Sequence, residues 1–208
     1  MTGPARRLVA ELEPYVGDAR VLGAIATVPR ELFVPPGMED RAYDNEAMSI
    51  GCGQTISQPL VVARMAALLQ LMPGDRVLDV GTGSGYHAAV LATLAARVWS
   101  IERHAALSAQ AAIALAAAGV HNVTLSVGDG SRGLPALAPF DAINVAAATP
   151  PDALGGLEAQ LAPGGRLVAP VTGPEQRLVL SRREADGTVR RRTLEEVRFV
   201  PLVRDPEP

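Results

Sequence analysis

Lysine is absent from this chain of 208 residues, whose 19 basic residues are all arginine. A Schiff base to pyridoxal phosphate, a catalytic lysine dyad and a P-loop nucleotide site each need an ε-amino group. The sequence therefore excludes these three chemistries, whatever the fold.

Cysteine is almost absent as well, because Cys52 is the only one. A single thiol cannot staple a small secreted fold or build a thiolate metal site, so we expect no metal centre and a reducing compartment, the cytoplasm. Cys52 stands between Gly51 and Gly53 with no histidine in its segment. This context favours a small filler residue over a nucleophile.

Long apolar runs are missing too. No stretch of about 18 apolar residues is available to span a bilayer, and the first residues lack the apolar core of a signal peptide. The net charge of −3 and the pI near 5.6 give no general attraction to phosphate backbones or anionic lipid. The one basic cluster, at 190–192, has no interleaved aromatic residues, which favours a solvated strand face. We therefore expect no membrane and no nucleic acid among the partners, and a monomer.

Hydrophobic residues make up 48% of the chain and charged residues 20%, as in a globular protein. No repeat or linker divides it, so we expect a single domain over 1–208, with an N-terminal part over 1–70 and a core over 71–208. Apolar spacing predicts two short helices before Pro29 and another helix after Pro59. Residues 29–58 are rich in proline, glycine and polar residues and show no period, which predicts a long functional loop.

From residue 76 onward, short apolar runs alternate with helical segments. Strands are predicted over 76–80, 98–101, 123–127, 140–145 and 166–169, with helices between them near 87–96, 104–118 and 152–161. Such alternation is typical of a doubly wound, mostly parallel α/β sheet. A hairpin around Asp186-Gly187 and a last strand over 197–203 make the C-terminal edge antiparallel.

The segment VLDVGTGSGY places Gly81, Gly83 and Gly85 directly after the first parallel strand and before a helix. Glycines let the backbone adopt positive φ and approach a ligand closely. A dinucleotide fingerprint needs glycine or alanine at the sixth position, where this chain has Tyr86. The spacing, after a strand that ends in an acid, favours S-adenosylmethionine as the ligand.

Two carboxylates follow the next two strands. Glu102 ends the second strand, where its oxygens can accept from ribose hydroxyls, and Asp129 follows the third, within reach of an adenine amino group. Taken singly, Glu102 could be a helix-cap neighbour and Asp129-Gly130 a turn. Together they indicate a cofactor crevice at three strand ends. The predicted cofactor residues are Asp79, Gly81, Thr82, Gly83, Gly85, Glu102, Gly128, Asp129 and Gly130.

These segments, in this order, resemble the protein-L-isoaspartate (D-aspartate) O-methyltransferase family over nearly the whole chain. The resemblance is carried by PRELFVP (29–35), IGCGQTISQP (50–59), VLDVGTGSGY, SIER (100–103), GDG, APFDAI, QLAPGGRLVAPV and RFVPLV. It implies a Rossmann-like class I methyltransferase with an N-terminal helical extension. The implied substrates are isoaspartyl peptides and proteins, whose methylation initiates repair through a succinimide.

The resemblance also implies that Ser57 is the active-site residue and that Gln176 lies near the cofactor. The acceptor is a carboxylate, which is ionised at neutral pH and needs no general base. A hydrogen bond from the Ser57 hydroxyl would suffice to orient it, and the predicted substrate-binding residues are Gly53, Gln54, Thr55 and Ile56.

Several alternatives stay open. Ser57 could cap the helix that begins at Pro59. The enzyme could methylate a programmed aspartate in a biosynthetic peptide precursor, or belong to another class as a nicotinamide oxidoreductase. It could also be a non-catalytic cofactor-binding module.

Overall fold

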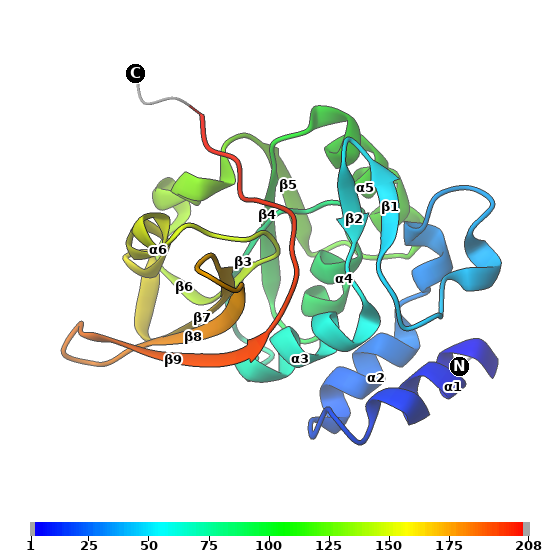
Figure 1. Cartoon of the computed structure of the whole chain (residues 1–208), viewed down its shortest axis with the longest axis horizontal. Coiled ribbons are helices and arrows are strands. Elements are labelled where there is room, and N and C mark those ends of the chain that lie inside the picture. The colour runs from blue at the N-terminus through cyan, green and yellow to red at the C-terminus, as the bar shows by residue number, and fades with distance from the viewer. Residues whose placement is uncertain (1–2, 206–208) are drawn as a thin grey trace.

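The computed structural model describes residues 3–205 and contains one seven-stranded sheet (Figure 1). Its strands, in spatial order, are β5 (Val123–Val127), β4 (Arg97–Glu102), β3 (Arg76–Val80), β6 (Phe140–Val145), β7 (Leu161–Val171), β8 (Arg177–Arg183) and β9 (Val189–Glu196). The first five run parallel, whereas β8 and β9 form the antiparallel edge. The predicted fold class is therefore confirmed.

Helices cover both faces of the sheet (Figure 1). They are α1 (Gly3–Leu12), α2 (Ala19–Thr27), α3 (Pro59–Leu69), α4 (Tyr86–Ala92), α5 (Ala105–Ala117) and α6 (Pro151–Glu158). One apolar cluster joins the first five helices to one face of the sheet, and a second, on the other face, includes Leu154 and Leu157 of α6. Because α1 and α2 share the first cluster with the sheet, the N-terminal part has no core of its own.

The segment 29–58 contains more regular secondary structure than the predicted loop. It contains two short 3₁₀ turns, Arg30–Phe33 and Glu39–Arg41, and a hairpin of β1 (Met48–Gly51) and β2 (Gln54–Ile56). Cys52 (φ 51°) and Gly53 (φ 70°) form the turn. The strands are so short, and so rich in glycine and polar residues, that their alternation is not visible in the sequence.

The predicted last strand over 197–203 is wrong. Beyond β9 the chain leaves the sheet edge and returns across the molecule as an extended segment (Figure 1). Its only bridge within the described residues joins Pro201 to Ala148. Proline has no N–H to extend a ladder, so the apolar run covers the strand ends instead of adding a strand.

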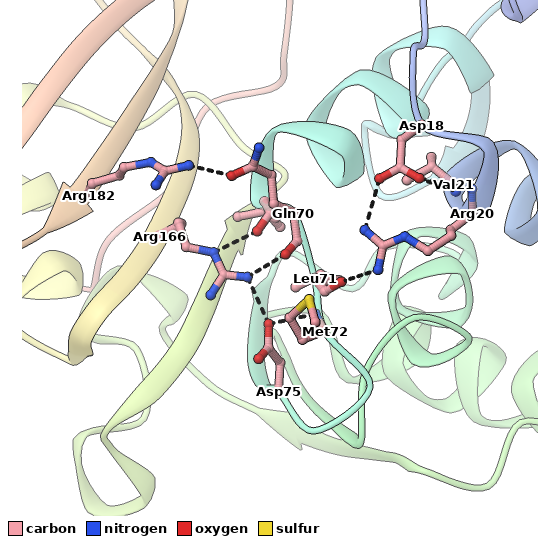
Figure 2. Close-up of polar contacts among 10 residues, drawn as sticks. Asp18, Arg20, Val21, Gln70, Leu71, Met72, Asp75, Arg166 and Arg182 are labelled. Atoms are coloured by element: carbon pink, nitrogen blue, oxygen red, sulfur yellow. Dashed lines mark hydrogen bonds and ion pairs between the residues drawn. The ribbon is translucent and has the colours of Figure 1, made fainter.

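Arg166 of β7 fixes the C-terminal end of α3 to the sheet (Figure 2). Its Nε donates to the Leu69 carbonyl at 2.7 Å, and its Nη2 donates to the Gln70 carbonyl and to Asp75, both at 2.8 Å. Helix C-termini leave carbonyls without partners, which this guanidinium supplies.

Candidate cofactor and acceptor site

A cavity lies at the carboxyl ends of β3, β4 and β6, where open α/β sheets bind ligands. It is lined by Gln54, Thr55, Val80, Gly81, Gly83, Ile101, Glu102, Arg103, His104, Gly130, Ala146, Ala147, Val200, Pro201, Leu202 and Val203. Four of the predicted cofactor residues therefore meet in one place, namely Gly81, Gly83, Glu102 and Gly130.

The three glycines of the loop have different roles. Gly81 (φ 94°) and Gly83 (φ 53°) line the cavity. Gly85 (φ 88°) lies outside it and precedes α4, where a Cβ would stand 3.1 Å from that of Ala111 in α5. Gly85 therefore lets α4 and α5 approach closely, which the sequence analysis did not distinguish from cofactor contact.

Glu102 fixes the loop and faces the cavity. The Gly83 N–H donates to one carboxylate oxygen and the His104 N–H to the other, each at 2.9 Å. Each oxygen keeps a second lone pair for a donor in the cavity. Glu102 is thus oriented by the backbone and available to a pair of hydroxyl groups.

Gly130 is required by close packing at the cavity floor. A Cβ at this position would lie 2.7 Å from Val80 Cγ1, whereas one at Gly128 would lie 3.6 Å from Ile101 Cδ1, an ordinary contact. We expect Gly130→Ala to lower the free energy of unfolding by about 1–3 kcal/mol, because it overpacks the end of β3. Gly128→Ala should change it by less than about 1 kcal/mol. Urea denaturation of both variants checks this, and equal destabilisation would contradict it.

Asp129, a predicted cofactor residue, is not one of the residues that line the cavity. Its carboxylate accepts from the Ser131 N–H at 2.9 Å and from the Asp205 N–H at 3.0 Å. Burial acts to raise the pKa of Asp129, but the hydrogen bonds from Asp205 and Ser131 outweigh it and lower the pKa. Asp129 therefore holds the C-terminal segment in place.

Asp79 and Thr82 lie beneath the loop and are buried, not exposed to the cavity. Asp79 accepts from Ser100 Oγ and from Asn144 Nδ2, both at 2.7 Å. Because the Ser100 proton points to Asp79, Thr82 Oγ1, at 2.6 Å, donates to Ser100 Oγ. These hydrogen bonds link strands β3, β4 and β6 to the glycine loop, so Asp79 and Thr82 support the loop from below.

Two titratable groups in this network are strongly perturbed. Burial raises the pKa of Asp79 to about 6, partly offset by its bonds to Asn144 and Ser100. Burial lowers the pKa of His87 to about 3. His87 Nδ1 lies 3.3 Å from Asn144 Nδ2, and its Nε2 has no partner within residues 3–205. His87 is therefore neutral at neutral pH, and its buried ring lines neither cavity.

Gln176 also lies outside the cavity. Its amide pairs with the backbone of Phe199, donating to the carbonyl at 3.2 Å and accepting from the N–H at 2.7 Å. Both amide atoms are thus used to fix the start of the C-terminal segment. Gln176 lines a neighbouring pocket together with Phe199, and its place near the cofactor stays a prediction.

A second cavity adjoins the first and contains Ser57. It is lined by Ala47, Thr55, Ser57, Gln58, Val61, Ala146, Glu196, Val197, Arg198, Phe199 and Val200. Thr55, Ala146 and Val200 line both cavities. Ser57 is therefore next to the predicted cofactor site.

The alternative that Ser57 caps α3 is wrong. The residue before the helix is Gln58, and the Leu60 N–H donates to Asn45 Oδ1 at 3.0 Å. Ser57 Oγ makes no hydrogen bond with any residue that the structure describes. The hydroxyl is therefore not committed to the fold.

The predicted substrate residues divide into two groups. Gln54 and Thr55 line the cofactor cavity. Gly53 is exposed at the hairpin turn, and the Ile56 side chain is buried in the core, which leaves only backbone groups to contact a ligand.

Several cavity residues were not predicted from the sequence. Ala146 and Ala147 directly follow β6, so the strand-end rule that found Glu102 would have found them. Arg103 lines the cavity and donates to the Val203 carbonyl at 2.8 Å. Residues 200–203 were predicted as part of a strand and not as a cavity wall, because the path of the returning segment depends on such distant contacts.

Comparisons with known proteins identify the same family that the sequence motifs resemble. The family model described as protein-L-isoaspartate(D-aspartate) O-methyltransferase matches residues 5–207. A protein-L-isoaspartate O-methyltransferase of Roseiflexus castenholzii is 51% identical over 90% of this chain and 86% of its own. One from Erwinia tasmaniensis is 48% identical over 98% of both chains.

Solved structures show the same fold. A protein-L-isoaspartate O-methyltransferase superposes with a TM-score of 0.86 and 27% identity, over 95% of this chain and 65% of that one. A Plasmodium falciparum structure of the same family name, in complex with S-adenosyl-L-homocysteine, superposes with a TM-score of 0.81 and 24% identity, over 96% and 98%. The chain belongs to the protein-L-isoaspartate(D-aspartate) O-methyltransferase family.

Proposed function

We propose that the chain transfers a methyl group from S-adenosylmethionine to the free α-carboxylate of L-isoaspartyl residues in damaged peptides and proteins, with the acceptor held beside Ser57. Family membership supports the reaction. The observation that supports the placement is that the glycine-loop cavity and the Ser57 cavity share three wall residues. Donor and acceptor can therefore meet at Thr55, Ala146 and Val200.

The residues present fit S-adenosylmethionine. Gly81 and Gly83 expose backbone without side chains, and Glu102 offers two oriented carboxylate oxygens to ribose hydroxyls. The apolar residues Val80, Ile101 and Leu202 suit a heterocycle. When bound, S-adenosylmethionine would supply an electrophilic methyl group. The acceptor carboxylate would become a methyl ester as the methyl–sulfur bond breaks, and S-adenosylhomocysteine would be the leaving group.

The acceptor cavity needs to orient a charged nucleophile and exclude water from it. Ser57 Oγ is available as a donor, and Val61, Val197 and Phe199 provide apolar walls. A hydroxyl hydrogen bond to one carboxylate oxygen fixes its direction, and the apolar walls limit its hydration. The chain thus supplies position and partly apolar walls, and no base is needed.

The product explains the link to repair. The methoxy group of a methyl ester is a better leaving group than the oxygen of a carboxylate. The neighbouring backbone amide nitrogen can therefore attack the ester carbonyl, release methanol and close a succinimide. The succinimide reopens in part to normal aspartate. Repair needs no further group on this chain once the ester has formed.

Acceptor specificity tests this proposal. We expect labelled methyl transfer to a synthetic isoaspartyl peptide and none to the same peptide with aspartate. Methylation of the aspartyl peptide would favour a precursor-modifying enzyme. No transfer to either, with S-adenosylhomocysteine still bound, would favour a binding module, and binding of NAD instead would favour the oxidoreductase.

Glu102 provides a test of the cofactor site. We expect Glu102→Ala to raise the Kd of S-adenosylhomocysteine about 100-fold, because two charge-assisted hydrogen bonds of roughly 1.5 kcal/mol or more are lost. Glu102→Gln, which keeps one acceptor, should show an intermediate loss. Calorimetric titration measures both, and wild-type affinity in Glu102→Ala would refute the assignment.

We also propose that the chain is a single-domain, cytoplasmic monomer that does not bind nucleic acid. Within the described residues, no helix is long and apolar enough to cross a membrane. The basic cluster is partly engaged in ion pairs within the chain, since Arg191 pairs with the buried Glu158 and Arg190 pairs with Glu184 at the surface. This supports a structural use of the hairpin arginines over recognition of phosphate.

A further inference from the structure

Arg30 is an unusual residue for the interior of a protein. Its side chain is completely buried in the 3₁₀ turn Arg30–Phe33, and it bonds to backbone carbonyls and to no carboxylate of the described residues. Burial lowers the pKa of Arg30, with a partial offset from the neighbouring Tyr86. Burying a charge without a paired acid is unfavourable, so fold stability alone gives no reason for a guanidinium here.

The contacts of Arg30 lead to the active-site serine. Its Nη2 donates to the Ser57 carbonyl at 2.8 Å, and its Nε donates to the Ala42 carbonyl at 2.8 Å. The two bonds hold both ends of the segment 42–57, which contains the hairpin. Fixing the Ser57 carbonyl fixes the peptide plane after Ser57, and so restrains the backbone position from which its side chain projects.

The other side of Arg30 leads to the cofactor loop. The guanidinium lies 4.5 Å from the ring centre of Tyr86, the first residue of α4, and Phe33 packs edge-on against the same ring. Burial raises the pKa of Tyr86 to about 12, so the hydroxyl is neutral. Tyr86 directly follows Gly85, which places Arg30 between the glycine loop and Ser57.

We propose that Arg30 is a positioning residue that sets Ser57 in register with the glycine loop, and so aligns the acceptor carboxylate with the methyl donor. The inference rests on the proposed role of Ser57. Arg30 itself touches neither ligand cavity. It acts through the Ser57 carbonyl on one side and the Tyr86 ring on the other.

A double-mutant cycle tests this role. Lysine keeps the charge but cannot hold two carbonyls with the fixed geometry of a guanidinium. We expect Arg30→Lys to lower kcat for an isoaspartyl peptide at least about tenfold, because a misplaced acceptor reacts slowly. In the Ser57→Ala background the same change should lower kcat less than about twofold. The Kd of S-adenosylhomocysteine should stay within about twofold.

Arg166→Lys is the matched control. Arg166 also donates to backbone carbonyls, but at the opposite end of α3 (Figure 2). A structural role predicts a lower Tm with kcat unchanged in both backgrounds. Arg30→Gln, which removes the buried charge, undergoes the same measurements if Arg30→Lys does not fold cooperatively.

Three results would overturn the inference. They are an unchanged kcat in Arg30→Lys, an equal fold-loss with and without Ser57, and a loss of cofactor affinity as large as the loss of kcat. If the wild-type chain methylates no isoaspartyl peptide, the proposed function fails, and the inference fails with it. If the wild type is active but the effects of Arg30→Lys and Ser57→Ala are additive, the inference about Arg30 fails and the proposed function stands.

Discussion

Replacing Ser57 by alanine is expected to lower kcat for an isoaspartyl peptide about 100-fold, the size of effect found when one oriented donor to a reacting oxygen is removed. The Kd of S-adenosylhomocysteine should not change, because Ser57 lies in the second cavity and not in the first. Stability should also be unchanged, since the hydroxyl bonds to no residue that the structure describes. Steady-state kinetics, calorimetry and thermal melts measure the three quantities.

Ser57→Thr is an informative companion, because it retains a hydroxyl on a bulkier side chain. A kcat between those of the wild type and Ser57→Ala would support a donor role. An alanine variant with full kcat would remove Ser57 from the mechanism and leave backbone groups of the hairpin to orient the acceptor.

A second large effect is expected in the pH dependence of stability. The folded-state pKa of Asp79, about 6, is above its ordinary value of 3.8. Its contribution is therefore complete below about pH 3.8 and is lost as the pH rises through 6. The folded-state pKa of His87, about 3, is below its ordinary value of 6.5. Its contribution is complete above pH 6.5 and is lost as the pH falls toward 3. The two dependences oppose each other between about pH 4 and 6.

Single variants should separate these opposed contributions. Without His87, as in His87→Gln, the free energy of unfolding should rise relative to wild type by about 3 kcal/mol between pH 7 and pH 4. Without the Asp79 carboxylate, as in Asp79→Asn, it should fall relative to wild type over the same interval by about 2 kcal/mol. Urea denaturation at a series of pH values measures both. Changes of the same sign in the two variants would contradict the assigned pKa shifts.

Much of the sheet could be predicted from the sequence, because its strands are short apolar runs separated by helices. The segments 76–80, 123–127 and 140–145 are strands with the predicted bounds. The hairpin at 48–56 was missed because it is too short for a visible period. The segment 197–203 was mistaken for a strand, because an apolar run does not reveal whether it pairs with a sheet edge or packs over the ends of the strands.

The site was predictable to the extent that it follows from strand ends. Gly81, Gly83, Glu102 and Gly130 meet because parallel strands bring their carboxyl ends together. The partners of Asp129 and Gln176 were not predictable, because the sequence does not show which distant backbone group occupies a side chain. Arg30 was missed for a related reason, since an arginine in a polar loop is usually exposed.

The most direct test of the account is a crystal structure with S-adenosylhomocysteine and an isoaspartyl peptide bound together. The account predicts that the ribose hydroxyls lie on Glu102 and that the cofactor sulfur faces the wall formed by Thr55, Ala146 and Val200. It also predicts that Ser57 Oγ donates to the isoaspartyl α-carboxylate. A carboxylate beyond hydrogen-bond distance of Ser57, or a cofactor bound away from the glycine loop, would contradict it.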